Sequence, residues 1–247
     1  AIVVAQFGNT RPYSTLMRMV RELAMLDHQR NNGLILHAAG IEKDGRATLI
    51  AAPKRGGKST FLLGAISEGA SMLANDRLIL TEKEGRVEAV GMPTVVSLRE
   101  GSLALFPQVR DKLRSQWMHF RRRPQGTKRS HKRVLSPLQL CRLLDAPPCE
   151  RAEVGKVLFL KQGNGPARRL TREELRTRLS AMLFDFTDTE SHMLADIYPV
   201  GKARFHSSIE RMSTLIARQA VCLEYPREGE SPRREAPVKN TVEAPLP

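Results

Sequence analysis

The chain has 247 residues, of which 41% are hydrophobic and 27% charged, and its formal net charge is +14. Its apolar runs are shorter than the roughly 18 residues of a membrane-spanning helix, and no signal-peptide pattern opens it, so we expect a cytoplasmic protein without a membrane partner. The three cysteines are odd in number and form no C-x-x-C motif, which argues against a disulfide framework and a structural zinc site.

A helix and a β-hairpin are the first predicted elements. The helix lies within residues 13–32 and stops at Asn31-Asn32-Gly33. Its apolar residues recur at helical spacing and predict a core-packing face made of Leu16, Met19, Val20, Leu23 and Leu26. Two short apolar runs then flank Lys43-Asp44-Gly45, and the Asp-Gly pair is typical of a hairpin turn.

The hairpin leads into a glycine-rich segment, APKRGGKST, residues 52–60, which precedes a helical pattern that ends at Gly69. A phosphate-binding loop reads G-x-x-x-x-G-K-[ST], and this segment matches except that Ala52 occupies the first glycine position. In such a loop, backbone N–H groups and a helix N-terminus surround a phosphate. The alternative is an ordinary glycine turn before a helix. On the first interpretation, the nucleotide-binding residues are Pro53, Lys54, Arg55, Gly56, Gly57, Lys58, Ser59 and Thr60.

Chemically active side chains stand before, in and after this segment. Lys58 is expected to contact the β- and γ-phosphates, and the Ser59 hydroxyl to bind a magnesium ion. His37 lies on the preceding hairpin strand, and Asn75 and Asp76 end the strand-like segment that follows. A carboxylate at that place can supply a second magnesium ligand or a base for phosphoryl transfer. Taken singly, a structural histidine and a turn-capping aspartate are the alternatives.

The middle of the chain predicts a second hairpin and then a long basic excursion. The hairpin covers residues 77–90, with Glu84-Gly85 at its turn. The excursion, residues 107–150, is interrupted by prolines and contains a short helix that starts at Ser136.

The excursion carries ten Lys or Arg residues between Arg110 and Arg133, against the single acidic Asp111. Such a run can bind DNA or RNA, contact an anionic substrate or nucleotide, or be a solvated loop. Aromatic residues make up only 5% of the chain and do not alternate with these charges, so a nucleic-acid partner is the least favoured of the three.

The C-terminal part predicts a strand at residues 156–162, a helix at 172–183, a second helix and a final strand, VCLEYP. Thr171 with Glu174, and Ser207 with Glu210, have the spacing of capping boxes at the two helix starts. The proline- and charge-rich residues 226–247 predict a disordered tail. We therefore expect one α/β domain over residues 1–225.

Three segments together resemble one protein family: LHAAG at 36–40, the glycine-rich loop, and ISEGASMLANDRLIL at 66–80. They resemble HPr kinase/phosphorylase and its bacterial relatives in the phosphoenolpyruvate-carboxykinase-like superfamily, over residues 33–106. The resemblance implies a mixed-sheet P-loop domain with flanking helices that binds ATP and Mg²⁺. It aligns the family's functional positions with His37, Lys58, Ser59, Asn75, Asp76 and Arg77, and it gives Ser59 and Asp76 to the metal.

The sequence also departs from the family pattern. The aspartate that serves the family as base falls on Asn75, and an amide cannot accept that proton at neutral pH. Pro53 and Lys54 replace an acidic residue and a serine of the loop, and Arg55 replaces a glycine. The family's E-I-R-G-type segment has no good counterpart. The resemblance therefore implies a divergent relative and does not imply that HPr is recognised.

The leading functional prediction is an ATP-dependent kinase that moves a γ-phosphoryl group to a hydroxyl of a small molecule, peptide or protein. Relatives act in peptide natural-product pathways, so the resemblance makes a peptide one candidate acceptor. The alternative is a nucleotide-binding regulatory or assembly partner without turnover, because Asn75 replaces the base. The sequence leaves open GTP or pyrophosphate as donor, and a homo-oligomer is compatible with it.

Overall fold

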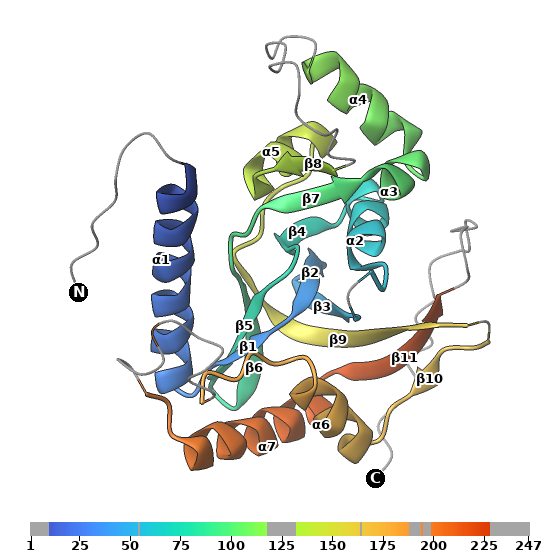
Figure 1. Ribbon diagram of the computed structural model, residues 1–247. Coiled ribbons are helices and arrows are strands. Elements are labelled where there is room, and N and C mark those ends of the chain that lie inside the picture. Colours follow the sequence, from blue (N-terminus) through green and yellow to red (C-terminus); the bar gives the residue numbers. More distant parts are fainter. Residues whose placement is uncertain are drawn as a thin grey trace.

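The computed structural model describes residues 10–53, 55–117, 132–163, 165–187, 194 and 199–227 (Figure 1). Three parts of the predictions fall outside these residues: Lys54 of the loop, residues 118–131 of the basic run, and the tail after Arg227. Arg227, which was predicted to lie in the tail, instead completes the last strand.

A mixed, curled β-sheet forms the centre of this α/β structure (Figure 1). In the described residues it has nine strands, in the order β1-β5-β6-β9-β3-β2-β4, with β11 beside β9 and β10 beside β11. The strands are β1 (Leu34–Leu36), β2 (Ala38–Lys43), β3 (Arg46–Ala51), β4 (Ser71–Ala74), β5 (Leu78–Lys83), β6 (Arg86–Gly91), β9 (Arg151–Gln162), β10 (Arg168–Arg169) and β11 (Val221–Arg227). A separate antiparallel pair joins β7 (Val96–Arg99) to β8 (Lys132–Leu135).

The long strand β9 joins the parts of the sheet. It pairs in parallel with β3 on one side and with β11 on the other, and its first residues pair antiparallel with β6. The last residue of β3, Ala51, lies opposite Phe159 of β9. The glycine-rich loop therefore leaves the sheet at the carboxyl end of an internal parallel strand, which is where open α/β sheets place their ligands.

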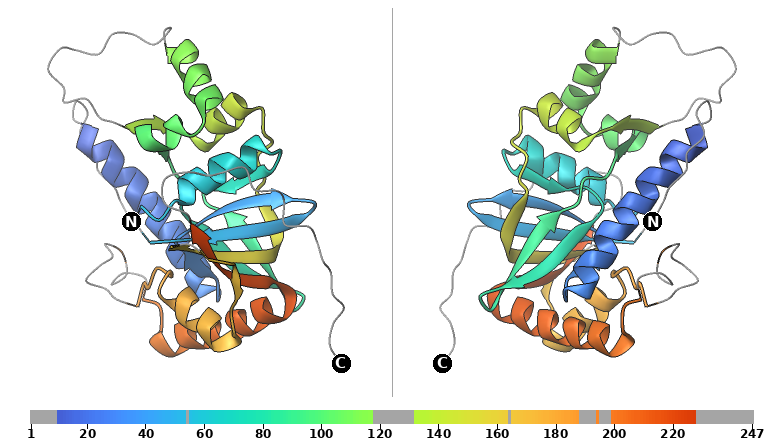
Figure 2. Two further views of the ribbon diagram at one scale, coloured as in Figure 1. Left: turned by 90° about the vertical axis from the view of Figure 1, so that its right-hand side faces the viewer. Right: turned by 90° about the vertical axis from the view of Figure 1, so that its left-hand side faces the viewer.

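Helices cover both faces of the sheet. One layer contains α2 (Lys58–Ser67), α3 (Glu100–Ala104), α4 (Pro107–Trp117) and α5 (Pro137–Leu144). The other contains α6 (Arg172–Ser180) and α7 (Lys202–Gln219), and α1 (Thr10–Arg30) runs along the side of the molecule. Figures 1 and 2 show these two layers above and below the strands.

Two buried clusters result, one on each face of the sheet. In β3, Leu49 belongs to the cluster under α6 and α7, while its neighbour Ile50 belongs to the cluster under α2. In β9, Phe159 and Leu158 divide in the same way. Strands buried on both faces read as continuous apolar runs, which explains why both were visible in the sequence.

Most of the predicted local structure is confirmed. The turns Asp44-Gly45 and Glu84-Gly85 join antiparallel pairs, β2 with β3 and β5 with β6. Ser136 caps α5 by accepting a hydrogen bond from the Gln139 N–H, and Thr171 forms a complete capping box with Glu174. The three cysteines are free.

Three local predictions are wrong. The helix α7 begins at Lys202 after Gly201, so Ser207 lies within it and does not cap it. The helix α6 ends at Ser180, and the residues after it turn toward the sheet. Val20 of α1 was predicted to face the core but is 53% exposed, and Met25 is buried instead.

No helix among the described residues combines the length and the apolar character that a bilayer crossing requires.

Candidate functional site

The glycine-rich loop connects the end of β3 to the start of α2, as the phosphate-loop pattern requires. Its backbone is left-handed at Arg55, with φ 67°, and at Gly57, with φ 91°. The Gly56 N–H donates to the Pro53 carbonyl at 2.8 Å. A Cβ at Gly56 would lie 2.7 Å from the Cβ of Ala52, so the methyl group at the non-glycine position is accommodated because position 56 has no side chain.

The start of α2 has no side-chain cap. Gly57 is the N-cap residue, and it lacks the hydroxyl or carboxylate that usually bonds the N–H groups of a first helical turn. No acidic residue lies in that turn either. A helix start of this kind offers N–H donors and the positive end of the helix dipole to an anion.

Lys58, His37 and Asp76 form a row beside this helix start. The Lys58 Nζ donates to the Ala52 carbonyl at 2.7 Å and lies 3.1 Å from the Nε2 of His37. The Nδ1 of His37 lies 3.6 Å from the Oδ1 of Asp76. An ammonium group is only a donor, so the Nε2 accepts from it and the proton of a neutral ring is on Nδ1, facing the carboxylate.

The backbone at His37 is held by hydrogen bonds to the segment that follows α6. The residue lies between β1 and β2, one position before the strand on which it was predicted. Its N–H donates to the Met182 carbonyl at 2.7 Å, and the Phe184 N–H donates to the Ile35 carbonyl at 2.8 Å. These bonds attach the segment after α6 to the strand that carries the histidine.

Burial and charge act on the ionisation of these groups. Burial is the main cause that lowers the pKa of His37 below 6.5; Asp76 opposes it, and Lys58 and Arg77 add to it. Burial also lowers the pKa of Lys58, and again Asp76 opposes the change. Lower pKa values keep the imidazole neutral near pH 7, which is the form that can accept a proton.

Asn75 is not free to take part in this row. It is 8% exposed, its Nδ2 donates to the Val95 carbonyl at 3.1 Å, and its Oδ1 accepts from the Thr94 hydroxyl at 2.9 Å. Both ends of the amide therefore tie the end of β4 to the segment that enters β7. Its inclusion among the catalytic residues finds no support in this geometry, because the side chain is satisfied by structural hydrogen bonds.

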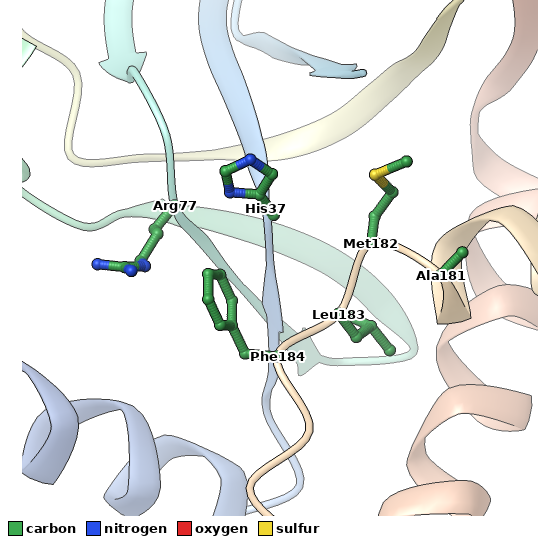
Figure 3. Close-up of a pocket in the computed structure, with 6 residues that line it drawn as sticks. All are labelled: His37, Arg77, Ala181, Met182, Leu183 and Phe184. Carbon is green, nitrogen blue, oxygen red and sulfur yellow. The ribbon is translucent and has the colours of Figure 1, made fainter. Parts of the chain in front are cut away.

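Arg77 and His37 line a pocket of about 420 Å³ together with Ala181, Met182, Leu183 and Phe184. Figure 3 shows the six residues, with the guanidinium of Arg77 beside the Phe184 ring. The Cζ of Arg77 lies 4.7 Å from the centre of that ring, and the His37 ring meets the same ring edge-on at 5.9 Å.

The sequence did not reveal that residues 181–184 line a pocket beside His37. A helix was predicted as far as residue 183, and only the three-dimensional pairing of Leu36 with Leu183 brings this segment to His37. Thr60 was predicted to bind nucleotide, but its hydroxyl lies 3.2 Å from that of Ser102 in α3, so it also has a structural contact.

Ser59 and Asp76, the predicted magnesium ligands, offer the oxygen atoms that this ion prefers. Among the described residues there is no group of three or more His, Cys, Asp or Glu side chains that could hold a metal. Mg²⁺ commonly takes only one or two protein ligands and completes its shell with phosphate oxygens and water, so the chemistry of the two side chains is compatible with this ion.

No family model matches the chain, and no curated protein matches it. Among solved structures, it is similar to the Hpr(Ser) kinase/phosphatase from Coxiella burnetii, with 16% sequence identity and a TM-score of 0.34. The match covers 55% of this chain and 76% of that one. The functional proposal therefore depends on the residues of this chain.

Proposed function

We propose that the protein is an ATP- and magnesium-dependent phosphotransferase that moves a γ-phosphoryl group to a hydroxyl acceptor. The observation that carries the proposal is the row of Lys58, His37 and Asp76 beside the uncapped start of α2. A phosphate-binding cation, a neutral base and a carboxylate are the groups that phosphoryl transfer uses, and here they are adjacent.

In this proposal the loop binds the donor. The N–H groups that follow Gly57 hold phosphate oxygens, and Lys58 exchanges its contacts with Ala52 and His37 for a contact with the phosphates. Release of Lys58 leaves the Nε2 of His37 without its donor. Binding of the donor thereby frees the base for the acceptor hydroxyl.

Transfer then proceeds by displacement at phosphorus. The acceptor oxygen forms a bond to the γ-phosphorus while the bond from that phosphorus to the β,γ-bridging oxygen breaks, and ADP leaves with the electron pair. The hydroxyl proton passes to the Nε2 of His37, and Asp76 stabilises the resulting imidazolium through Nδ1–H. A magnesium ion held by Ser59 and Asp76 would neutralise charge that develops on the phosphate oxygens.

The second candidate function is nucleotide binding without turnover. It is favoured by the position of Asn75, since the residue aligned with the family's base is a buried amide that bonds Val95 and Thr94. The two functions share the loop and differ in whether His37 acts as base.

Calorimetry and a transfer assay test the proposal together. We expect the full chain to bind Mg·ATP with measurable heat and to release ADP when a hydroxyl acceptor is present. Parallel titrations with Mg·GTP and pyrophosphate identify the donor. Absence of heat with all three donors rejects both functions, whereas binding without any ADP release from ATP, in the presence or absence of acceptors, supports the second.

A further inference from the structure

The pocket next to His37 shares that imidazole with the glycine-rich loop. Lys58 contacts His37 at Nε2, and the same ring forms part of the wall of the 420 Å³ pocket. A molecule in this pocket therefore lies beside the proposed base without occupying the loop. The volume suits a small molecule or the end of a chain.

One cation, Arg77, lies in the pocket wall, and a second, Arg21 of α1, is near enough for its charge to act on Arg77. The Nε atoms of Arg77 and of Arg21 in α1 are both buried, and neither has a hydrogen-bond partner. Buried N–H groups are nearly always hydrogen-bonded, so the unpartnered Nε atoms of these two arginines suggest that an acceptor belongs in this region.

Within the described residues, ion pairs do not compensate the positive charge near Arg77. Burial is the main cause that lowers the pKa of Arg77; Arg21 and Arg18 of α1 lower it further, and Asp76 opposes them. None of these three arginines has an ion pair within the described part of the chain. Glu22, the neighbour of Arg21, is buried and accepts a hydrogen bond from the Leu194 N–H.

Phe184 gives Arg77 a fixed orientation. The Cζ of Arg77 lies over the aromatic ring, 4.7 Å from the ring centre. A cation–π contact of this kind holds the guanidinium in place without using its N–H donors, which stay available to an anion. Helix α1 lies on the Arg77 side of the pocket in Figure 3, and the charge of its Arg21 lowers the pKa of Arg77, so a second element contributes positive charge to this region.

We infer that this pocket is the acceptor subsite, and that it takes a small hydroxyl compound whose carboxylate or phosphate binds Arg77 in the pocket wall, with Arg21 of α1 as a second cation near Arg77. The inference rests on the proposed function and adds the chemical class of the acceptor. Its hydroxyl faces His37 while its anionic group pairs with Arg77.

Calorimetry on the full chain at constant ionic strength tests this assignment with three related probes: glycerate, glycerol 3-phosphate and glycerol. We expect one or both anions to bind and glycerol to give no heat, and the stronger anion identifies carboxylate or phosphate as the preferred group. Equal binding of glycerol, or no binding of either anion, overturns the inference.

Two arginine variants locate the anion. Arg21→Gln removes one charged donor, so we expect the affinity for the bound anion to fall about tenfold. Arg30→Gln, at the exposed C-terminal end of the same helix, changes the net charge equally and should leave the affinity unchanged. Equal losses in the two variants show a general charge effect and reject the site.

Lys58→Ala separates this inference from the proposed function. The variant should lose Mg·ATP binding and keep anion binding, because Lys58 is not among the residues that line the pocket. Loss of anion binding in this variant places the anion on the glycine-rich loop and rejects the acceptor subsite. If the wild-type chain binds the anions but binds no nucleotide, the proposed function is rejected. The pocket is then an anion-binding site without a role in phosphoryl transfer.

Discussion

Left-handed backbone occurs in two hairpin turns and in the glycine-rich loop, with different consequences. In the hairpins, φ is 54° and 76° at Asp44-Gly45 and 52° and 76° at Glu84-Gly85, and the strands pair up to the turn on both sides. In the loop, Arg55 and Gly57 have φ values of 67° and 91°, but the chain leaves a strand and enters a helix.

The difference lies in what happens to the backbone hydrogen-bonding groups. Strand pairing satisfies those of a hairpin, whereas the first N–H groups of α2 receive no side-chain cap. Left-handed dihedrals therefore complete a hydrogen-bonded turn in the hairpins, whereas in the loop they leave N–H groups available to bind an anion. Variants of Lys58 and Arg55 in the loop, each compared with a variant in the first hairpin, test this difference directly.

The largest expected effect is that of Lys58→Ala. Lys58 is the first residue of α2 and supplies a positive charge for the phosphates, so its loss should reduce turnover by at least about 100-fold and abolish thermal stabilisation by Mg·ATP. The matched control is Lys43→Ala, at the exposed end of the first hairpin. Comparable losses in both variants would show that the loop has no special role.

His37→Gln tests the base. We expect the rate constant kcat to fall by about 10²-fold or more, while nucleotide binding is retained. The pKa of His37 is lowered below 6.5, so the neutral base is present at pH 7, and the wild-type rate should fall only as the pH decreases through that lower value. A pH–rate profile of the variant should lack this acid limb; if the limb persists, another group, such as Asp76, is the base.

Asn75→Asp tests the structural role of the buried amide. A carboxylate cannot donate to the Val95 carbonyl, so we expect a loss of about 1–3 kcal/mol in the free energy of unfolding at pH 7. Burial should raise the pKa of the new carboxyl group, so the loss should shrink as the pH falls and the group is protonated. Denaturant unfolding at several pH values measures this. Gain of phosphotransfer activity, rather than loss of stability, would instead show that position 75 belongs to the catalytic region.

The smallest effects are expected from glycine at the left-handed positions. Arg55→Gly relieves backbone strain but increases the freedom of the unfolded chain, so the free energy of unfolding should change by less than about 1 kcal/mol. Asp44→Gly in the hairpin should change the free energy of unfolding by a similarly small amount. Only Arg55→Gly should alter the affinity for Mg·ATP. Thermal unfolding with and without nucleotide compares the two, and an equal change in affinity would contradict the distinction between loop and hairpin.

The sequence by itself determined features that depend on neighbouring residues. The two hairpin turns, the caps at Ser136 and Thr171, and the strand-loop-helix order around Lys58 all follow from local conformational preferences and from hydrophobic period. The cap predicted at Ser207 is wrong, because α7 extends back to Lys202 and its tertiary packing overrides the local capping signal.

Only the tertiary structure decided which side chains meet. His37 and Lys58 are 21 positions apart, and Phe184 reaches His37 only because its segment hydrogen-bonds along β1. Likewise, Asn75 and Asp76 are adjacent in sequence, yet one is buried in a structural network and the other faces His37. Burial and long-range pairing create these differences, and neither is written in the identity of a residue or its immediate neighbours.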